Sequence, residues 1–454
     1  MIAMLRAAGF VALVVSGVLL GELRLGFAQS TSFDDTARFL AGMPPSAGSA
    51  LVPLTQDPAW QQHARYFDSA FGNVDKNQFS KVRAWSSAKL PTSHQVLFYF
   101  FSGPDFLYAN AFFPNASTYV MAGLEPVGPV PDLLRLPRGS LDGALRHIES
   151  SLSTILTISF FKTHDMRMTL GASSVSGTLP ILYVFLARSG KTIHDVSLIK
   201  LDDQGMPQPE SAPSPPGMKN SAHGVKILFT DEDGREKTLY YFGTNVAGAG
   251  FKSSGLEKFC DRLGTGDAFV KSASYLLHGN GFTDVRSFLL QHAALVLQDD
   301  TGIPVAYLSP DKWELRPFGR YTGPINMFAR NYQPRLTQLI QSGRAEPLSF
   351  GLGYQWRVLG SNLLLATRTG SGAEPQVSNQ STPAERSSNQ ADVGLEGKPL
   401  ASTNPDDPSS SSVAPVPANP APKKTAKKTQ RQQRANNMVT PQPFFWPFFW
   451  GQRH

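Results

Sequence analysis

The stretch that decides the fold is residues 96–101, Val-Leu-Phe-Tyr-Phe-Phe. Six apolar residues in a row, with Pro91 before them and Gly103-Pro104 after them, predict a strand that is buried on both faces. A short helix is expected over 105–113, and a second apolar run follows at 118–124. A strand, a short helix and a strand within about 30 residues predict a βαβ unit, whose two strands run parallel.

Later segments add helices and hairpins to this beginning. Apolar residues recur every three or four positions over 141–156, which predicts an amphipathic helix with Ser140 as its cap. Another helix is expected over 268–278. Three antiparallel hairpins with Asp, Asn or Gly in their turns are expected over 225–242, 294–308 and 350–367. The predicted fold class is mixed α/β, with a parallel βαβ start and antiparallel hairpins and packed helices added.

The first 28 residues have the composition of a secretory signal peptide. Arg6 precedes an apolar stretch, and the small residues Gly26 and Ala28 stand three and one positions before the expected cut. The apolar stretch is about 14 residues long, which is short for a membrane span, so a retained anchor is the alternative. We therefore expect a protein that is periplasmic or secreted.

The rest of the chain divides into a body and a tail. Residues 29–369 have the composition of a globular α/β body, with a candidate sub-division near the Pro- and Ser-rich stretch 202–221. Residues 370–440 contain no aromatic residue and few Ile, Leu or Val, so we expect a disordered linker with a basic patch. Residues 441–454 form an aromatic C-terminal segment.

Charge and cysteine content exclude several classes of protein. The net charge is +7, but six of the basic residues lie between Lys423 and Arg434 in the tail, so the body is close to neutral. A nearly neutral body gives no indication of nucleic-acid binding. The only cysteine, Cys260, cannot form an internal disulfide or a multi-cysteine metal site, and we interpret it as a small buried apolar residue.

Polar residues follow both of the first two predicted strands. Ser102 and Asp105 come after the first, and Glu125 comes after the second. Ligands of open α/β sheets bind outside the carboxyl ends of parallel strands, so Ser102, Asp105 and Glu125 are candidate ligand-binding residues of one crevice. The alternative is local: Ser102 or Asp105 caps the short helix, and Glu125 pairs with an arginine.

Asp311 repeats this pattern later in the chain. It follows Ser309-Pro310 after an expected strand that ends at Leu308, and Arg320 lies nearby. Asp311 and Arg320 are therefore candidates for a polar wall of the same crevice.

Signatures of nucleophilic or metal-dependent catalysis are missing. The chain has no Gly-x-Ser-x-Gly and no His-x-x-x-His or His-Glu-x-x-His spacing. His164-Asp165 and His194-Asp195 pair an imidazole with a carboxylate, but adjacent residues of a strand point to opposite faces and cannot both bind one metal. We expect no metal and no cofactor, and the catalytic residues, if any, stay unknown.

One segment resembles a known group of proteins. Phe101-Ser102-Gly103-Pro104-Asp105-Phe106-Leu107-Tyr108, together with 112–116 and 119–128, is similar to a segment of a family of uncharacterised exported bacterial proteins. The similarity covers about 28 residues. It implies a bacterial envelope setting and no particular activity.

Three functions fit these observations. The body of an envelope or periplasmic protein binds a small polar ligand or a partner, while the basic tail contacts an anionic membrane or cell-wall surface. Alternatively, Asp105 and Glu125 form the carboxylate pair of a hydrolase. In the third, the protein is a non-catalytic assembly factor. Whether it is an enzyme is left open.

Overall fold

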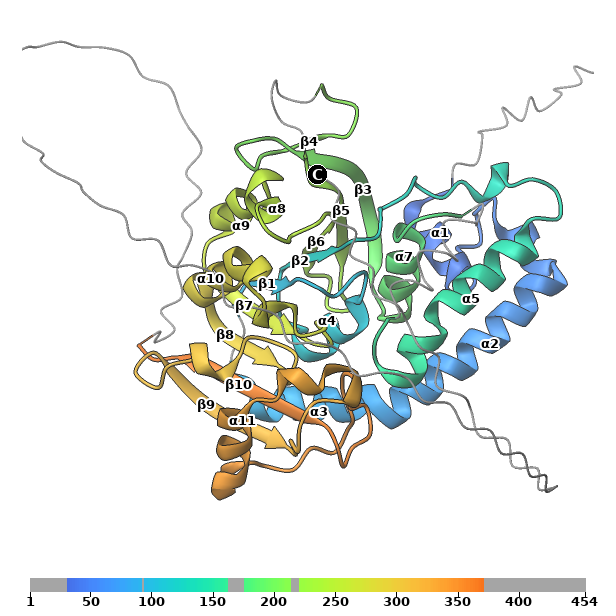
Figure 1. Ribbon diagram of the computed structural model, residues 1–454. Coiled ribbons are helices and arrows are strands. Elements are labelled where there is room, and N and C mark those ends of the chain that lie inside the picture. Colours follow the sequence, from blue (N-terminus) through green and yellow to red (C-terminus); the bar gives the residue numbers. More distant parts are fainter. Residues whose placement is uncertain (1–30, 92–93, 162–174, 214–219, 371–454) are drawn as a thin grey trace, which may run out of the picture. The chain divides into compact units, whose positions relative to one another are not determined.

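A mixed ten-stranded sheet is formed by the residues that the computed structural model describes, which are 31–91, 94–161, 175–213 and 220–370 (Figure 1). Its strand order is β4-β3-β5-β6-β2-β1-β7-β8-β10-β9. The strands are β1 Val96–Tyr99, β2 Thr118–Gly123, β3 Thr192–Leu201, β4 Pro207–Pro209, β5 His223–Thr230, β6 Glu236–Gly243, β7 Gly266–Val270, β8 Ala293–Gln298, β9 Trp313–Gly319 and β10 Asn362–Arg368.

The centre of the sheet is parallel and its two sides are antiparallel. Strands β6, β2, β1, β7 and β8 run in one direction, so their carboxyl ends share one edge of the sheet. Strands β3, β4 and β5 on one side, and β9 and β10 on the other, are added in antiparallel pairs. The predicted βαβ unit is confirmed, because β1 and β2 are parallel neighbours joined through the helix α4, Phe106–Phe112.

Helices cover both faces of the sheet. Side chains of β1 alternate between two cores. Leu97 and Tyr99 lie in the first core, with residues of α1, α2, α3, α4, α5 and α7, whereas Phe98 lies in the second core, with residues of α8, α9 and α10. This explains why the first apolar run shows no polar alternation. The helices are α1 Phe33–Leu40, α2 Pro58–Val74, α3 Ser80–Lys89, α4 Phe106–Phe112, α5 Leu141–Ile158, α7 Leu179–Arg188, α8 Gly250–Ser253, α9 Leu256–Leu263, α10 Thr283–His292 and α11 Pro334–Leu339.

Only one of the three predicted hairpins forms. Strands β5 and β6 pair in antiparallel fashion, as expected for 225–242. In the second, β8 pairs in parallel with β7, and the expected partner 303–308 contains a 3-10 turn at Val305–Tyr307. In the third, β10 pairs with β8 and β9 instead of the expected partner 350–358. These two predictions are wrong because one expected arm of each hairpin, 303–308 or 350–358, is not a strand, and Asp- and Gly-rich turns also connect strands to irregular segments.

Other local predictions are corrected as well. The helix expected over 268–278 is strand β7 followed by an irregular loop and a 3-10 turn at Leu276–His278. The amphipathic helix is α5, but Ser140 does not cap it with its side chain. The stretch 202–221 contains the short edge strand β4, and β3 and β5 on either side of it pair within the same sheet.

Cys260 lies on α9 within the second core. It is fully buried, and burial raises the pKa of its thiol well above the usual range. The interpretation as a small buried apolar residue is confirmed. Within the described part of the chain, no helix has both the length and the apolar character needed to cross a bilayer.

Candidate functional site

Four loops bring polar residues to the carboxyl edge of the parallel strands. The loop after β1 holds Asp105, the loop after β2 holds Glu125, the loop after β7 begins with Lys271, and the loop after β8 begins with Asp299 and Asp300. All five of these charged side chains are buried. Burying a charge is costly unless partners compensate it, so the partners of each decide its role.

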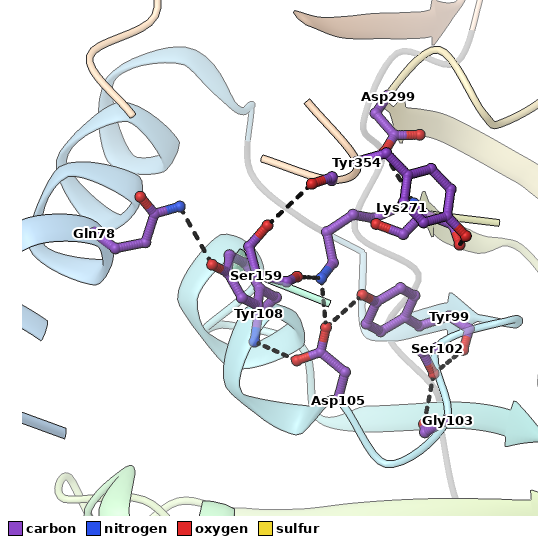
Figure 2. Close-up of polar contacts among 12 residues, drawn as sticks. Gln78, Tyr99, Ser102, Gly103, Asp105, Tyr108, Ser159, Lys271, Asp299 and Tyr354 are labelled. Carbon is purple, nitrogen blue, oxygen red and sulfur yellow. Dashed lines mark hydrogen bonds and ion pairs between the residues drawn. The ribbon is translucent and has the colours of Figure 1, made fainter. Parts of the chain in front are cut away.

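Asp105 lies at the centre of this cluster, at the N-terminus of α4 (Figure 2). Its Oδ1 accepts a hydrogen bond from the backbone N–H of Tyr108 at 3.2 Å, which caps the helix. Its Oδ2 accepts the hydroxyl proton of Tyr99 at 2.8 Å and lies 2.9 Å from the Nζ of Lys271. The capping role considered for Asp105 is therefore present, together with an ion pair that spacing did not indicate.

Lys271 reaches Asp105 from the end of β7, as Figure 2 shows. The side chains of both residues are only 2% exposed. The ammonium also donates to the backbone oxygen of Ser159 at the end of α5, and it lies 4.0 Å from the centre of the Tyr108 ring. A carboxylate, a carbonyl oxygen and an aromatic face thus surround the charge. The pair holds the end of β7, the start of α4 and the end of α5 together.

The tyrosine next to Asp105 keeps its proton. Burial, and then the negative charge of Asp105, raise the pKa of Tyr99 well above its usual value. Tyr99 therefore serves as a hydrogen-bond donor to the carboxylate and not as a base.

Asp299 and Asp300 form a second acidic group beside this pair. Asp299 accepts hydrogen bonds from the backbone N–H groups of Ser272 and Thr301, both at 2.9 Å. Asp300 accepts from the hydroxyl of Tyr275 and, at 3.1 Å, from the side-chain nitrogen of Asn362. Burial, and then the neighbouring Asp299 charge, raise the pKa of Asp300 to about 7. Asp300 can therefore exchange a proton near neutral pH.

Backbone strain is concentrated at this edge. In the described residues, the non-glycine residues with positive φ are Phe101, Ser159, Ser272, Ser274 and Tyr275, with φ between 51° and 69°. All five belong to the loop after β1, the end of α5 or the loop after β7. Such conformations cost about 1–3 kcal/mol each and cluster at functional sites, where the surrounding structure enforces them.

The rim of the cluster is formed by Tyr354. Its hydroxyl lies 2.7 Å from the Oγ of Ser274 and donates to the backbone oxygen of Ser272 at 3.0 Å. Ser272, Ser274 and Tyr354 are partly exposed, whereas Asp299 and Asp300 beneath them are buried. The strained loop therefore separates the carboxylates from solvent.

Gly353 closes over Asp299 and cannot carry a side chain. Its φ is +65°, and a Cβ there would lie 2.2 Å from the Oδ2 of Asp299. We expect Gly353→Ala to lower the free energy of unfolding by more than about 1 kcal/mol, as measured by urea denaturation. Gly139→Ala is the matched control, because Gly139 also has a positive φ, +78°, but open space around it. Equal losses in the two variants would contradict a specific clash at Asp299.

Ser102 and Glu125 lie at the carboxyl edge as predicted, but their surroundings differ from those of Asp105 and Lys271. The Oγ of Ser102 lies 2.8 Å from the backbone oxygens of Tyr99 and Gly103, so it fastens the turn after β1. A Cβ on Gly123 would lie 2.7 Å from the Oε2 of Glu125 and 2.9 Å from the Cα of Gly103. The Glu125 carboxylate thus lies on the β2 side of the turn, whereas Asp105 faces Lys271 on the β7 side.

Asp311 and Arg320 do not join this cluster. Asp311 is exposed and lies just before β9, which runs in the same direction as β8, so it is at the opposite edge of the sheet. The prediction failed because 303–308 is not a strand. Arg320 follows β9 at the correct edge, but it is exposed and four strands from β1, about 19 Å at a spacing of about 4.8 Å.

The residues that the sequence did not indicate are Lys271, Asp299 and Asp300. Lys271 was assigned to a helix, and the two aspartates were assigned to a hairpin turn. The available signal was the continuous apolar run in 293–297, which is typical of a strand buried on both faces and hence of a parallel one.

The histidine pairs have no metal-binding geometry where they are described. His194 Nε2 lies 2.9 Å from the Oγ1 of Thr230, and Asp195 accepts from Ser197 at 2.7 Å. His164-Asp165 lies outside the described residues. Over 31–91, 94–161, 175–213 and 220–370, no three His, Cys, Asp or Glu side chains come close enough to hold a metal ion.

Comparisons of the chain with models of known protein families, with curated proteins and with solved structures gave no match. The chemistry of the site is therefore inferred from its own geometry. Asp105 and Lys271 neutralise each other, and their hydrogen-bonding groups are occupied. Asp300, whose pKa is raised to about 7, leaves the cluster negatively charged above neutral pH. Such a cluster suits a ligand that donates hydrogen bonds or carries a positive charge.

Proposed function

We propose that this is an exported protein whose body binds a small polar ligand at the carboxyl edge of the parallel strands. The observation that carries the proposal is the concentration of left-handed, non-glycine backbone in the loops of that edge. Strain of this kind persists only where packing enforces it, and the carboxyl edge is where open α/β sheets bind their ligands. The loops after β7 and β8 form the proposed site.

Two buried polar atoms indicate what the ligand offers. The Oγ of Ser272 and the Oδ1 of Asn362 have no hydrogen-bond partner in the described part of the chain. Both residues contact the acidic group, Ser272 through Asp299 and Asn362 through Asp300. Since the Asn362 oxygen is an acceptor and the neighbouring groups are carboxylates, a ligand with an ammonium or several hydroxyl groups complements the site.

Ligand binding is a better supported function than hydrolysis catalysed by an Asp105–Glu125 pair. Both oxygens of Asp105 already accept from Tyr99, Tyr108 or Lys271, and the side chain is only 2% exposed, so the carboxylate is poorly placed to act on a substrate or a water. The carboxylate that takes up a proton near neutral pH is Asp300 instead. If no small molecule binds, the remaining candidate function is that of a non-catalytic assembly factor.

The test is a thermal-shift and calorimetric screen of the purified full chain with putrescine, choline, ethanolamine, glycerol and glucose. We expect an ammonium-bearing compound or a polyol to raise the melting temperature, and Asp300→Asn to weaken its binding about ten-fold or more, because a charge-assisted hydrogen bond is worth about 1.5–3 kcal/mol. Asp311→Asn, at the opposite edge, is the matched control. No binding by any of these compounds, or equal binding by Asp300→Asn, would overturn the proposal.

Export, and contact of the tail with an anionic surface, are proposals that depend on residues outside the described part of the chain. Residues 1–28 support export through their signal-peptide pattern, and the basic residues between Lys423 and Arg434 support contact with an anionic surface. N-terminal sequencing of the protein after expression in a Gram-negative host is expected to start near Gln29. An intact Met1 in the membrane fraction would contradict cleavage.

A further inference from the structure

A pocket lies at the edge of the sheet opposite the proposed site. It has a volume of about 610 Å³, within the range of about 300–1,000 Å³ that is common for small-molecule sites. Pro114 before β2, Lys191 before β3 and Glu232 in the turn before β6 place it at the amino edge of the parallel strands. The pocket is therefore separate from the carboxyl-edge site, and a ligand bound here would be independent of the function proposed for that site.

One wall of this pocket is apolar. Phe71 from α2, Phe79 before α3, and Leu107 and Ala111 from α4 line it. All four side chains are mostly buried in the first core and present only their edges to the pocket. An apolar group of a ligand would gain contact with these edges and lose contact with water.

The other wall carries charges of both signs, and most of them already have partners. Arg83 pairs with Asp75 at 2.7 Å. Arg188 pairs with Asp68 at 2.7 Å and packs over the Phe71 ring. The Arg83 guanidinium and the Nη1 of Arg188 are therefore paired without a ligand, whereas the Nη2 of Arg188 has no hydrogen-bond partner in the described part of the chain.

Lys191 and Glu232 are the exceptions. Neither side chain makes a hydrogen bond or an ion pair within the described residues, although both line the same pocket. The Glu232 carboxylate lies against Gly190, where an added Cβ would be 2.4 Å from its Oε1. Burial, and then the positive charge of Lys237, lower the pKa of Lys191, so the carboxylates near this ammonium do not fully compensate it. Lys191 and Glu232, which carry opposite charges, thus line one pocket without forming an ion pair with each other.

We propose that this pocket binds a small zwitterion, an α-amino acid with an apolar side chain. Its carboxylate would pair with Lys191 and its ammonium with Glu232, so that the ligand bridges the two charges. The side-chain amide of Asn110, which also lines the pocket and whose oxygen accepts no hydrogen bond in the described part of the chain, supplies a further polar contact. The ligand side chain would lie against the Phe71 and Phe79 wall.

Isothermal titration of the full chain with L-phenylalanine and L-leucine tests this proposal. The matched analogues are 3-phenylpropionate, which lacks the ammonium, and phenethylamine, which lacks the carboxylate. We expect saturable binding of at least one of the two amino acids, and at least ten-fold weaker binding of both analogues. Failure of both amino acids to bind, or equal binding of either analogue, would overturn the proposal.

Three variants distinguish a loss of ligand binding at the pocket from a general loss of folding. Lys191→Gln removes a charge without breaking any described contact and is expected to weaken binding about ten-fold. Gly72→Leu fills the pocket from α2, where an added Cβ has open space, and is expected to abolish binding while the melting temperature is maintained. Lys81→Gln, on an exposed part of α3 outside the pocket, is the control. Binding to Gly72→Leu with unchanged affinity would also overturn the assignment, whereas Asp300→Asn is expected to leave binding at this pocket intact.

Discussion

Replacing Lys271 by methionine is expected to lower the free energy of unfolding by about 3–5 kcal/mol, the usual cost of leaving a buried charge without its partner. The ammonium compensates Asp105 inside the protein, where both side chains are only 2% exposed. Methionine preserves most of the volume, so the loss measures the missing charge and not a cavity. Urea denaturation followed by far-UV circular dichroism gives the value.

A double variant distinguishes a charge effect from a packing effect. Asp105→Asn removes the carboxylate charge. Its Oδ1 can still cap α4, and its amide nitrogen, which replaces Oδ2, can donate a hydrogen bond to the Tyr99 hydroxyl. The combination of Asp105→Asn with Lys271→Met is therefore expected to be more stable than Lys271→Met alone, with a coupling energy of about 1–3 kcal/mol. Lys226→Met on β5, where the lysine has no ion pair in the described part of the chain, is the control and should change stability little. If the two substitutions change the free energy of unfolding by strictly additive amounts, the result would contradict a stabilising ion pair between Asp105 and Lys271.

The stability of the protein is expected to fall as the pH rises from about 4 to about 7. The pKa of Asp300 is raised from 3.8 to about 7 by burial and by the charge of Asp299, so the folded state binds a proton that the unfolded state has already lost in this interval. Each pH unit then costs about 1.4 kcal/mol, and the loss is complete above the folded pKa. Below pH 4 both states are protonated and the effect vanishes.

Asp300→Asn isolates this contribution from other titrating groups. The amide keeps the shape of the carboxyl group and stays neutral, so the dependence of stability on pH between 4 and 7 should become flatter than in the natural chain. Denaturation curves at pH 4.5, 5.5, 6.5 and 8 measure it. Asp132→Asn, at an exposed position paired with Arg135, should keep the original slope. An unchanged slope in Asp300→Asn would show that Asp300 is not the titrating group.

The two largest effects concern residues at the ends of β7 and β8, which local sequence patterns did not connect. The run 96–101 was sufficient to predict a strand buried on both faces, because its length and lack of polar alternation leave no solvent face. The run at 118–124 and the short helix between them then predicted the parallel pair of β1 and β2. The position of Asp105 and Glu125 at the carboxyl edge is a consequence of that pairing.

Tertiary structure alone decided the partners of those carboxylates. Strand β7 has only five residues and its sequence Gly-Asp-Ala-Phe-Val carries little local preference, so its place beside β1 comes from burial of Ala268 and Phe269 between the two helical layers. That placement brings Lys271 to Asp105 across 166 positions of sequence, counted from 271 − 105. Strand β10 likewise pairs with β8 and β9 and not with the adjacent segment 350–358, because strands of a sheet can form hydrogen bonds whatever their separation in the sequence. Composition and periodicity determined where the long apolar strands of this chain lie, whereas packing against the two helical layers determined the order of the strands and thereby the site.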